Sequence, residues 1–256
     1  MKRINPLLSS IIQNNQRISV SPLYKVAKLQ EQSLQLVSKI FSTLEPITIE
    51  VNATQDDVYK ATKDIFQSSL QNCSIAYTPH DDKILGVVIS ADVYLQKQLP
   101  DEDFNKIPSS IQKVFGLLDI CSQKLYQKKQ IEIQKLIENQ ILSQMMVAVS
   151  PEASGLNLGV NLLQHNLQLA QMNKFQMAKV ECTSQRSAQL GLKLDYELID
   201  EVYYQNVSIG DQNNFYWKDV PTKYKEEKLT ILSKQVQDFN SDNYNFNKQN
   251  ILQFLF

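Results

Sequence analysis

Apolar residues recur along this chain with two spacings, and the change from one to the other predicts where helices and strands lie. Spacings of three and four predict amphipathic helices over residues 31–44, 55–70, 111–136, 159–172 and 184–194. Short apolar or alternating runs predict strands at residues 24–28, 74–78, 83–91, 144–149, 177–182 and 198–204. We expect a partner for the last strand within residues 206–217, followed by a short helix within residues 222–236.

Helix breakers and turn residues support this division. Pro46 follows the first helical stretch and should end it, because a residue before proline disfavours the helical conformation. Residues 79–82, Pro-His-Asp-Asp, separate two strand runs and predict a hairpin turn. The predicted order β-α-α-β-β-α-β-α-β-α-β indicates an α/β fold with a mixed sheet and helices on both faces.

Length and composition describe one globular domain. The chain has 256 residues, of which 43% are hydrophobic and 21% charged. Its net charge is -1, so no basic surplus is present to bind a nucleic-acid backbone, and we expect no nucleic-acid partner. No apolar run approaches about 18 residues, so no membrane span is expected.

The cysteines and histidines do not form a recognisable metal or disulfide pattern. Cys73, Cys121 and Cys182 are far apart and odd in number, which argues against a disulfide framework and favours a reducing compartment. His80 should be exposed in the hairpin, and His165 should lie on the surface of its helix. Two separated histidines predict neither a metal site nor a catalytic triad.

The N-terminus leaves the compartment open. Lys2, Arg3 and Arg17 are its only charges, and no acidic residue precedes Glu31. Together with nearby leucines and isoleucines, this pattern is typical of an amphipathic organelle-targeting helix. We expect an intracellular protein, in the cytoplasm or alternatively in the mitochondrial matrix.

Residues 145–163, MMVAVSPEASGLNLGVNLL, form the most informative segment. They predict a short strand, a loop holding Pro151 and Gly155, and a helix from Gly159. Such a loop can direct successive backbone N–H groups at an anion, and the helix adds its positive end. The alternative is an ordinary strand-to-helix turn without a ligand.

This segment resembles the acetyl-coenzyme A loop of the GCN5-related N-acetyltransferases, the GNAT family. The family pattern is a strand ending in V-x-P, then R-G-x-G-x-G/A, then an amphipathic helix. The matching residues are Val149, Pro151, Gly155 and Gly159. Two positions depart, because Ser154 stands where arginine or glutamine is usual and Asn157 where glycine is usual.

The resemblance extends to both sides of this loop. MAKVECTS (177–184) is similar to the next strand, and SAQLGLKLDYEL (187–198) to a short helix that ends in a G-F/Y pair. FSTLEPIT (41–48) looks like the F-x-x-x-E-P-L segment of the arylalkylamine and polyamine branch. The resemblance implies a GNAT-like domain over residues 21–236 with a helical insert at 108–136. It leaves residues 1–20 as an extension and 237–256 as a tail.

The resemblance also implies a co-substrate and its contacts. Acetyl-CoA would bind without any metal. Backbone groups of Val147 and Val149 would pair with its pantetheine arm. The pyrophosphate would take backbone N–H donors from the loop and the first helical turn, namely Ser154, Gly155, Asn157, Gly159 and Val160.

Three side chains are implied in catalysis. Glu45 would remove the amine proton through water, and Thr183 and Ser187 would line the thioester and relay a proton. The alternatives are a solvated Glu45 at a helix end and hydroxyls that cap a helix. Two departures concern the same region: Gly191 stands where many members have a tyrosine acid, and Asp195 stands where glycine is usual.

Two functions follow. The first is acetyl-CoA-dependent N-acetylation of a small amine, for which four aromatic residues either frame the acceptor pocket or belong to the core: Tyr203, Tyr204, Tyr216 and Trp217. The second is a catalytically inactive GNAT-fold subunit held in a larger protein assembly through its two ends. The apolar residues of the segments 7–12 and 246–256 favour docking of both ends.

Overall fold

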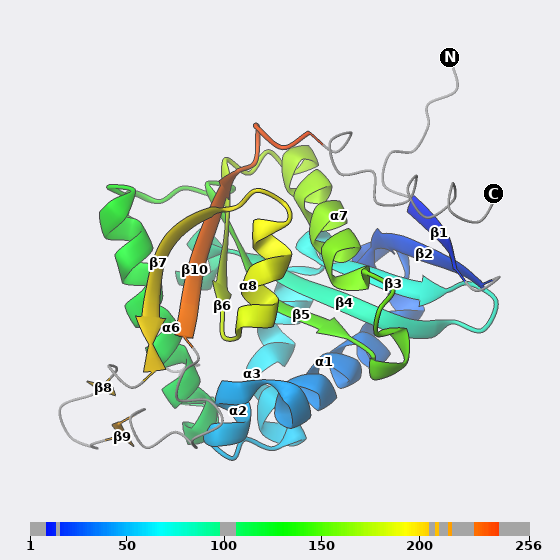
Figure 1. The fold of residues 1–256 in the computed structure, drawn as a ribbon, viewed down its shortest axis with the longest axis horizontal. Helices are drawn as coiled ribbons and strands as arrows, with labels where there is room; N and C mark the ends of the chain where they lie inside the picture. The colour runs from blue at the N-terminus through cyan, green and yellow to red at the C-terminus, as the bar shows by residue number, and fades with distance from the viewer. Residues whose placement is uncertain are drawn as a thin grey trace.

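The computed structural model describes residues 9–13, 16–97, 106–204, 208–209, 215–216 and 228–240. Within them one sheet has the strand order β1-β2-β3-β4-β5-β6-β10-β7 (Figure 1). Its strands are β1 (Ser9–Gln13), β2 (Gln16–Pro22), β3 (Ser74–Thr78), β4 (Lys83–Asp92), β5 (Ile141–Val149), β6 (Met177–Cys182), β7 (Glu197–Tyr203) and β10 (Lys228–Gln235). A separate pair consists of β8 (Ser208–Ile209) and β9 (Phe215–Tyr216).

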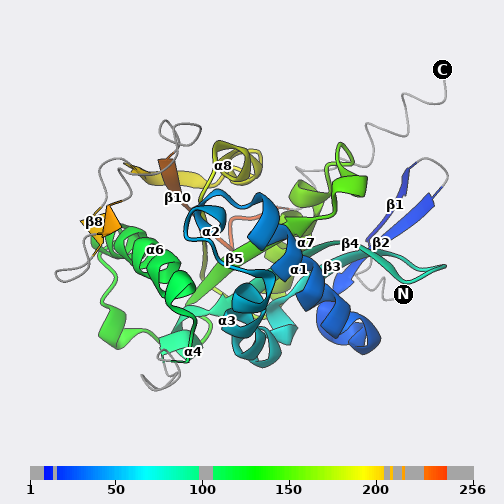
Figure 2. The same cartoon turned by 90° about the horizontal axis from the view of Figure 1, so that it is seen from below.

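Helices cover both faces of the sheet, as the sequence predicted. The helices are α1 (Gln30–Leu44), α2 (Pro46–Glu50), α3 (Gln55–Ser68), α4 (Val93–Lys97), α6 (Ser109–Lys128), α7 (Leu158–Met172) and α8 (Gln185–Leu192). α7 and α8 lie on one face, and α1, α2, α3 and α6 lie on the other (Figures 1 and 2). All neighbouring strands are antiparallel except β5 and β6, which are parallel. The predicted mixed sheet is therefore confirmed.

Several predicted elements match the structure closely. β3 and β6 have the predicted bounds, and residues 79–82 connect β3 to β4 as an antiparallel hairpin. The helix predicted at 31–44 is α1, and the one at 159–172 is α7. The helix predicted at 111–136 is shorter, because α6 ends at Lys128 and Gln130 has a positive φ of 54°.

The N-terminal prediction was wrong. Residues 24–28 are not a strand; they lie in two short 3-10 turns, Leu23–Lys25 and Ala27–Leu29. The first strands are instead β1 and β2, within the stretch that we assigned mainly to an extension, and β2 pairs with β3. Ile18 and Val20 are buried. Their alternation with serines is a strand pattern, but it is too short to distinguish this stretch from a polar tail.

The C-terminal prediction was also wrong. Residues 228–235 form the strand β10 and not part of a helix; β10 lies between β6 and β7 and pairs with both. The described partner of β7 is therefore β10, and the two described strands within 206–217, β8 and β9, pair with each other. β10 is buried on both faces, with Leu229 toward α6 and Leu232 toward α8. A strand covered on both sides loses the alternation that would reveal it. The apolar segments of residues 7–8 and 246–256 lie outside the described residues.

Candidate functional site

β5 and β6 separate part of the way along the sheet. Their pairing is limited to residues 141–143 with 177–179. Beyond that point residues 144–149 remain on β4, whereas residues 180–182 remain on β10. A register shift opposite Ile89 and Ser90 accompanies the separation, as β-bulges increase local twist. We call this point the branch. Among the described residues, the edge of 144–149 that faces β6 has no strand partner.

The loop after β5 has the backbone geometry of an anion cradle. Gly155 has φ 84°, and a Cβ atom placed there would meet nothing within 4 Å. Asn157 is left-handed (φ 53°, ψ 19°) and precedes α7 without capping it by its side chain. The first N–H groups of a helix have no partner within that helix. These groups of α7 can therefore bind a ligand. A left-handed backbone also explains why related loops have glycine where Asn157 stands.

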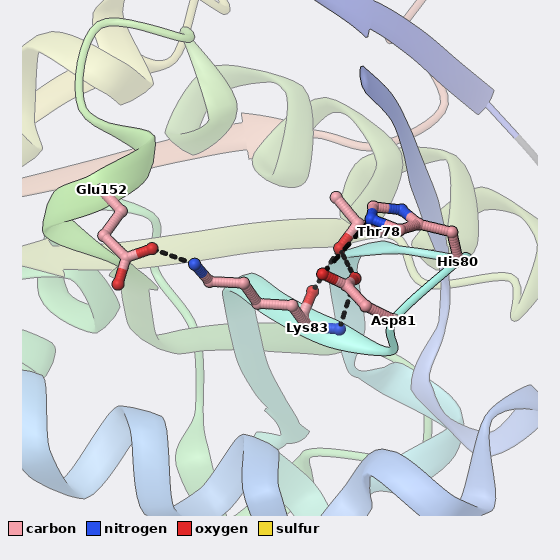
Figure 3. A network of polar contacts seen from close by, with 5 residues as sticks. All are labelled: Thr78, His80, Asp81, Lys83 and Glu152. Atoms are coloured by element: carbon pink, nitrogen blue, oxygen red, sulfur yellow. Dashed lines mark hydrogen bonds and ion pairs between the residues drawn. The ribbon is translucent and has the colours of Figure 1, made fainter. Parts of the chain in front are cut away.

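The start of this loop is fixed to β4. The Ser150 N–H donates to the Leu85 carbonyl at 2.9 Å. Lys83 forms an ion pair with Glu152, in the 3-10 turn Pro151–Ala153 (Figure 3). The carboxylate of Glu152 raises the pKa of Lys83. The segment leading to Gly155 is therefore held from the β4 side before the chain turns into α7.

The hairpin that carries Lys83 is itself ordered by polar contacts. Asp81 accepts hydrogen bonds from the Thr78 hydroxyl and from the Lys83 N–H (Figure 3). The Thr78 hydroxyl is the largest cause of a lowered pKa of Asp81. His80 is exposed, as predicted, with Nε2 3.4 Å from the Asp81 carboxylate.

A neutral hydrogen-bond network joins α7 to the branch. The buried Asn166 Oδ1 accepts from Ser90 Oγ and from Gln144 Nε2, both at 2.9 Å. Its Nδ2 donates to the Asn72 carbonyl at 2.7 Å. Gln144 in turn accepts from the Tyr196 hydroxyl at 2.5 Å. We call Ser90, Gln144, Asn166 and Tyr196 the amide network. Burial raises the pKa of Tyr196 well above its ordinary value, so the phenol stays protonated.

His165 was expected at the surface, and this was wrong. It is 2% exposed, and its Nδ1 lies 2.9 Å from the Ser74 hydroxyl of β3. α7 packs against the sheet, α8 and the turn Leu70–Asn72, so most of its residues are buried. Polar residues on the packed sides of α7, such as His165, are therefore buried.

A charged cluster lies on the opposite face of the branch. Lys179 and Glu181 of β6 form an ion pair, and their side chains are only 6% and 7% exposed. Lys179 Nζ donates to Ser122 Oγ of α6 at 2.6 Å, and Ser122 donates to Glu181. We call these three residues the charged cluster. Burial is the largest influence on Lys179 and alone would lower its pKa, but Glu181, Tyr126 and Asp119 together raise the net pKa. The sequence analysis missed this pair, although charges two apart in an apolar strand indicate one shared face.

Glu45 lies on the same face as the charged cluster. Its carboxylate caps α2 by accepting from the N–H groups of Ile47 (3.1 Å) and Thr48 (2.6 Å), and from the Thr48 hydroxyl. Ile47 packs into the apolar cluster around α6. Glu45 is therefore half-buried and fixed in position. Its role as a base stays a prediction.

The hydroxyls after β6 are used mainly in capping. Ser184 and Ser187 form a capping box at the start of α8, with both N–H to Oγ distances 3.2 Å. The Thr183 carbonyl accepts the Tyr204 hydroxyl at 2.6 Å. Burial raises the pKa of the neighbouring Cys182 to about 12, and a hydrogen bond with Ser187 opposes this. Capping thus accounts for Ser187, while no contact of the Thr183 side chain assigns it a role.

The two departures around residues 191 and 195 have structural explanations. A Cβ atom at Gly191 would lie 2.5 Å from Leu232 Cδ1 of β10. A tyrosine there would clash with β10. Asp195 has a positive φ of 54°, so the turn is left-handed there. Glycine is usual at this position because it adopts a left-handed backbone most readily.

The four aromatic residues do not form one described pocket wall. Tyr204 is 1% exposed, whereas Tyr203 is 42% exposed with Lys228 Nζ 5.6 Å from its ring centroid. Tyr216 lies in β9, and Trp217 lies outside the described residues. Tyr204 therefore belongs to the core, as the alternative held.

Other features lie away from the branch. A polar cavity of about 220 Å³ lies where β4 ends and β5 begins, lined among others by Asp92, Asn139 and Asn173. In the described part of the chain, no three His, Cys, Asp or Glu side chains gather as a metal site requires. None of the described helices is long and apolar enough to cross a membrane.

Comparisons with known proteins identify the fold. No protein-family model and no curated protein sequence matches the chain. Among solved structures, the C-terminal condensation domain of Ebony in complex with beta-alanyl-dopamine superposes with TM-score 0.71 at 16% identity, over 86% of this chain and 99% of that one. Arylalkylamine N-acetyltransferase 2 from Aedes aegypti gives 0.69 at 21%, over 86% and 99%. Polyamine N-acetyltransferase from Drosophila melanogaster gives 0.63 at 18%, over 85% and 99%. The chain has the GNAT fold, as its motifs predicted.

Proposed function

We propose that this protein is an acetyl-CoA-dependent N-acetyltransferase that acts on a small amine. The observation that carries the proposal is the branch between β5 and β6, which opens beside the N-terminal turn of α7. Two of the similar structures are N-acetyltransferases, one described as acting on arylalkylamines and one as forming N-acetylagmatine. A small amine is therefore the substrate class to test first.

The residues around the branch fit the co-substrate. The unpaired edge of β5 offers backbone groups of Val147 and Val149 for the pantetheine arm. The open space at Gly155 and the N–H groups of the first turn of α7, including those of Gly159 and Val160, suit the pyrophosphate. The Ser154 N–H does not serve this role as expected, because it donates to the Pro151 carbonyl at 3.1 Å. Acetyl-CoA, when bound, supplies an activated acetyl thioester. The amine nitrogen forms the C–N bond as the C–S bond breaks, and the thiolate takes a proton from solvent.

The amine must lose a proton to become a nucleophile. Glu45 is the base that we propose, because its carboxylate is held in place on the face of α2 and α6. A base that acts through one water need not touch the amine. The hydrogen bonds from Thr48 and Ile47 orient the carboxylate.

Binding and turnover test the proposal separately. Acetyl-CoA at about 100 times Kd should stabilise the protein by about 2.7 kcal/mol in a thermal-shift titration. Thiol release with a panel of arylalkylamines and agmatine then measures kcat/KM. We expect Glu45→Gln to lower kcat/KM by about 10²-fold while acetyl-CoA affinity is retained.

The control is Glu50→Gln, at the other end of α2, which should retain activity. Equal losses in the two variants would mean that α2, and not the Glu45 carboxylate, is responsible. A wild-type protein that shows no shift with acetyl-CoA would contradict the enzymatic proposal and favour a non-catalytic GNAT-fold subunit.

A further inference from the structure

We infer that Arg186, in the first turn of α8, binds the phosphates of the co-substrate and takes the place of the arginine that Ser154 replaces. The inference rests on the proposed function, because it adds a residue to the same binding site. It concerns affinity and not the chemical step.

Arg186 lies at the open side of the branch. α7 follows the end of β5 after a short loop, and α8 follows the end of β6 after Thr183 and Ser184. Both helices therefore begin where the two strands have separated. Figure 1 shows α8 in front of the gap between β5 and β6, with α7 beside it.

The face of α8 that carries Arg186 is set by a packing contact. A Cβ atom at Gly159, in the first turn of α7, would lie 3.0 Å from Leu190 Cδ1. Leu190 thus faces the start of α7. Arg186 precedes Leu190 by four residues, so both lie on the same face of α8. Helical side chains lean toward the N-terminus of their helix, which directs Arg186 away from Leu190 and toward the end of α8 that follows the separated part of β6.

The charges at the starts of α7 and α8 favour an anion. Neither α7 nor α8 has an acidic residue in its first turn. A cation in the first turn of a helix is unfavourable, because the end of the helix is already positive. Arg186 adds a cation to the first turn of α8, one helical turn before the residue that faces the start of α7. A bound pyrophosphate would reverse that cost and accept a two-pronged contact from the guanidinium.

The guanidinium is available for such a contact. Arg186 is exposed, and within the described residues it has no hydrogen bond or ion pair. Two basic residues beside the loop and the branch are already engaged, Lys83 with Glu152 and Lys179 with Glu181. A solvated surface arginine would be equally free, so the test must separate a phosphate contact from general surface charge.

The test compares two ligands on matched variants. CoA carries the phosphates, and acetyl-pantetheine carries the same pantetheine arm, with an acetyl group on its sulfur, without them. Their affinities are measured by calorimetry and thermal shift on the full chain. We expect Arg186→Gln to weaken CoA about tenfold and to leave acetyl-pantetheine unchanged, with a smaller dependence of CoA affinity on salt. Arg186→Lys should recover part of the loss.

Lys193→Gln is the control, because Lys193 is an exposed cation on the same side of α8 but about 10 Å further along its axis. It should bind CoA as the wild type does. Unchanged CoA affinity in Arg186→Gln, or equal losses for both ligands, would overturn the inference and leave the proposed function intact. If the wild type binds neither ligand, the proposed function fails and this inference fails with it.

Discussion

The two faces of the branch between β5 and β6 are held by opposite kinds of polar chemistry. On the α7 face the amide network consists of neutral groups, and its donors meet amide or carbonyl oxygens. On the α6 face the charged cluster holds an ammonium and a carboxylate that are almost completely removed from water. Both are buried at the same level of the sheet, where residues 141–143 leave residues 177–179.

The difference matters because a neutral hydrogen-bond network and a buried ion pair have different energetic costs. A fully satisfied neutral network stabilises a core. A buried ion pair gains little over apolar residues of the same volume, because both charges lose their hydration. The amide network is therefore explained by stability alone. The charged cluster is not, and it lies on the face where Glu45 and α2 pack against α6.

The largest effect is expected from breaking the ion pair on one side. Glu181→Leu leaves the ammonium of Lys179 buried without its carboxylate. We expect a loss of about 3–5 kcal/mol in the free energy of unfolding, measured in urea. The double variant Lys179→Met with Glu181→Leu should recover most of that loss. If the double variant is as unstable as the single variant, the ion pair stabilises the fold more than apolar residues of the same volume do.

The amide network should respond to a single change at its centre. Asn166→Leu keeps the approximate volume but removes the partners of Ser90 Oγ, Gln144 Nε2 and the Asn72 carbonyl. Each buried group left without a partner is unfavourable, so we expect a loss of about 2–3 kcal/mol. Thermal unfolding measures it. A melting temperature equal to that of the wild type would show that water enters and replaces the side chain.

The sequence predicted several helices and strands at or near their true bounds, including the buried α7, β3 and β6. α1 and α3 are amphipathic and were found at nearly their true bounds. β10 was mistaken for a helix because it is apolar toward both faces. The first two strands were missed because alternation over a few residues, such as Ile18 and Val20, is also common in polar tails.

For the site, the loop was predictable and the polar clusters were not. Gly155 and Asn157 indicate backbone geometry directly, and both have positive φ. Asn166 and Glu181 take their meaning from partners 76 and 59 residues away in the chain. Spacing cannot reveal such contacts. The functions of Glu45, Thr183 and Ser187 also depend on distances to ligands, which a sequence does not contain.

A smaller change tests whether the amide network is cooperative. Tyr196→Phe removes only the hydroxyl that donates to Gln144 at 2.5 Å. We expect a loss of about 1 kcal/mol, since Gln144 keeps its bond to Asn166. Combining the change with Asn166→Leu gives a double-mutant cycle. Strictly additive losses would show that Tyr196 and Asn166 act independently and do not form one network.

The smallest effect concerns a second ion pair on the α6 face, this time exposed. Lys124 Nζ lies 2.7 Å from the Asp200 carboxylate, and the two side chains are 41% and 40% exposed. The hydrogen bond from Lys124 is the largest cause of a lowered pKa of Asp200. A carboxyl with a lowered pKa stabilises the fold above its unfolded pKa of about 3.9 and loses that contribution as the pH falls through its folded value.

Because solvent screens the pair, we expect Asp200→Asn to lower the free energy of unfolding at pH 7 by less than about 1 kcal/mol. The difference from the wild type should shrink as the pH falls below about 4. Urea unfolding of both proteins between pH 3 and pH 7 measures this. A difference in the free energy of unfolding that stays constant over that range would show that Asp200 stabilises the fold by packing and not by its charge.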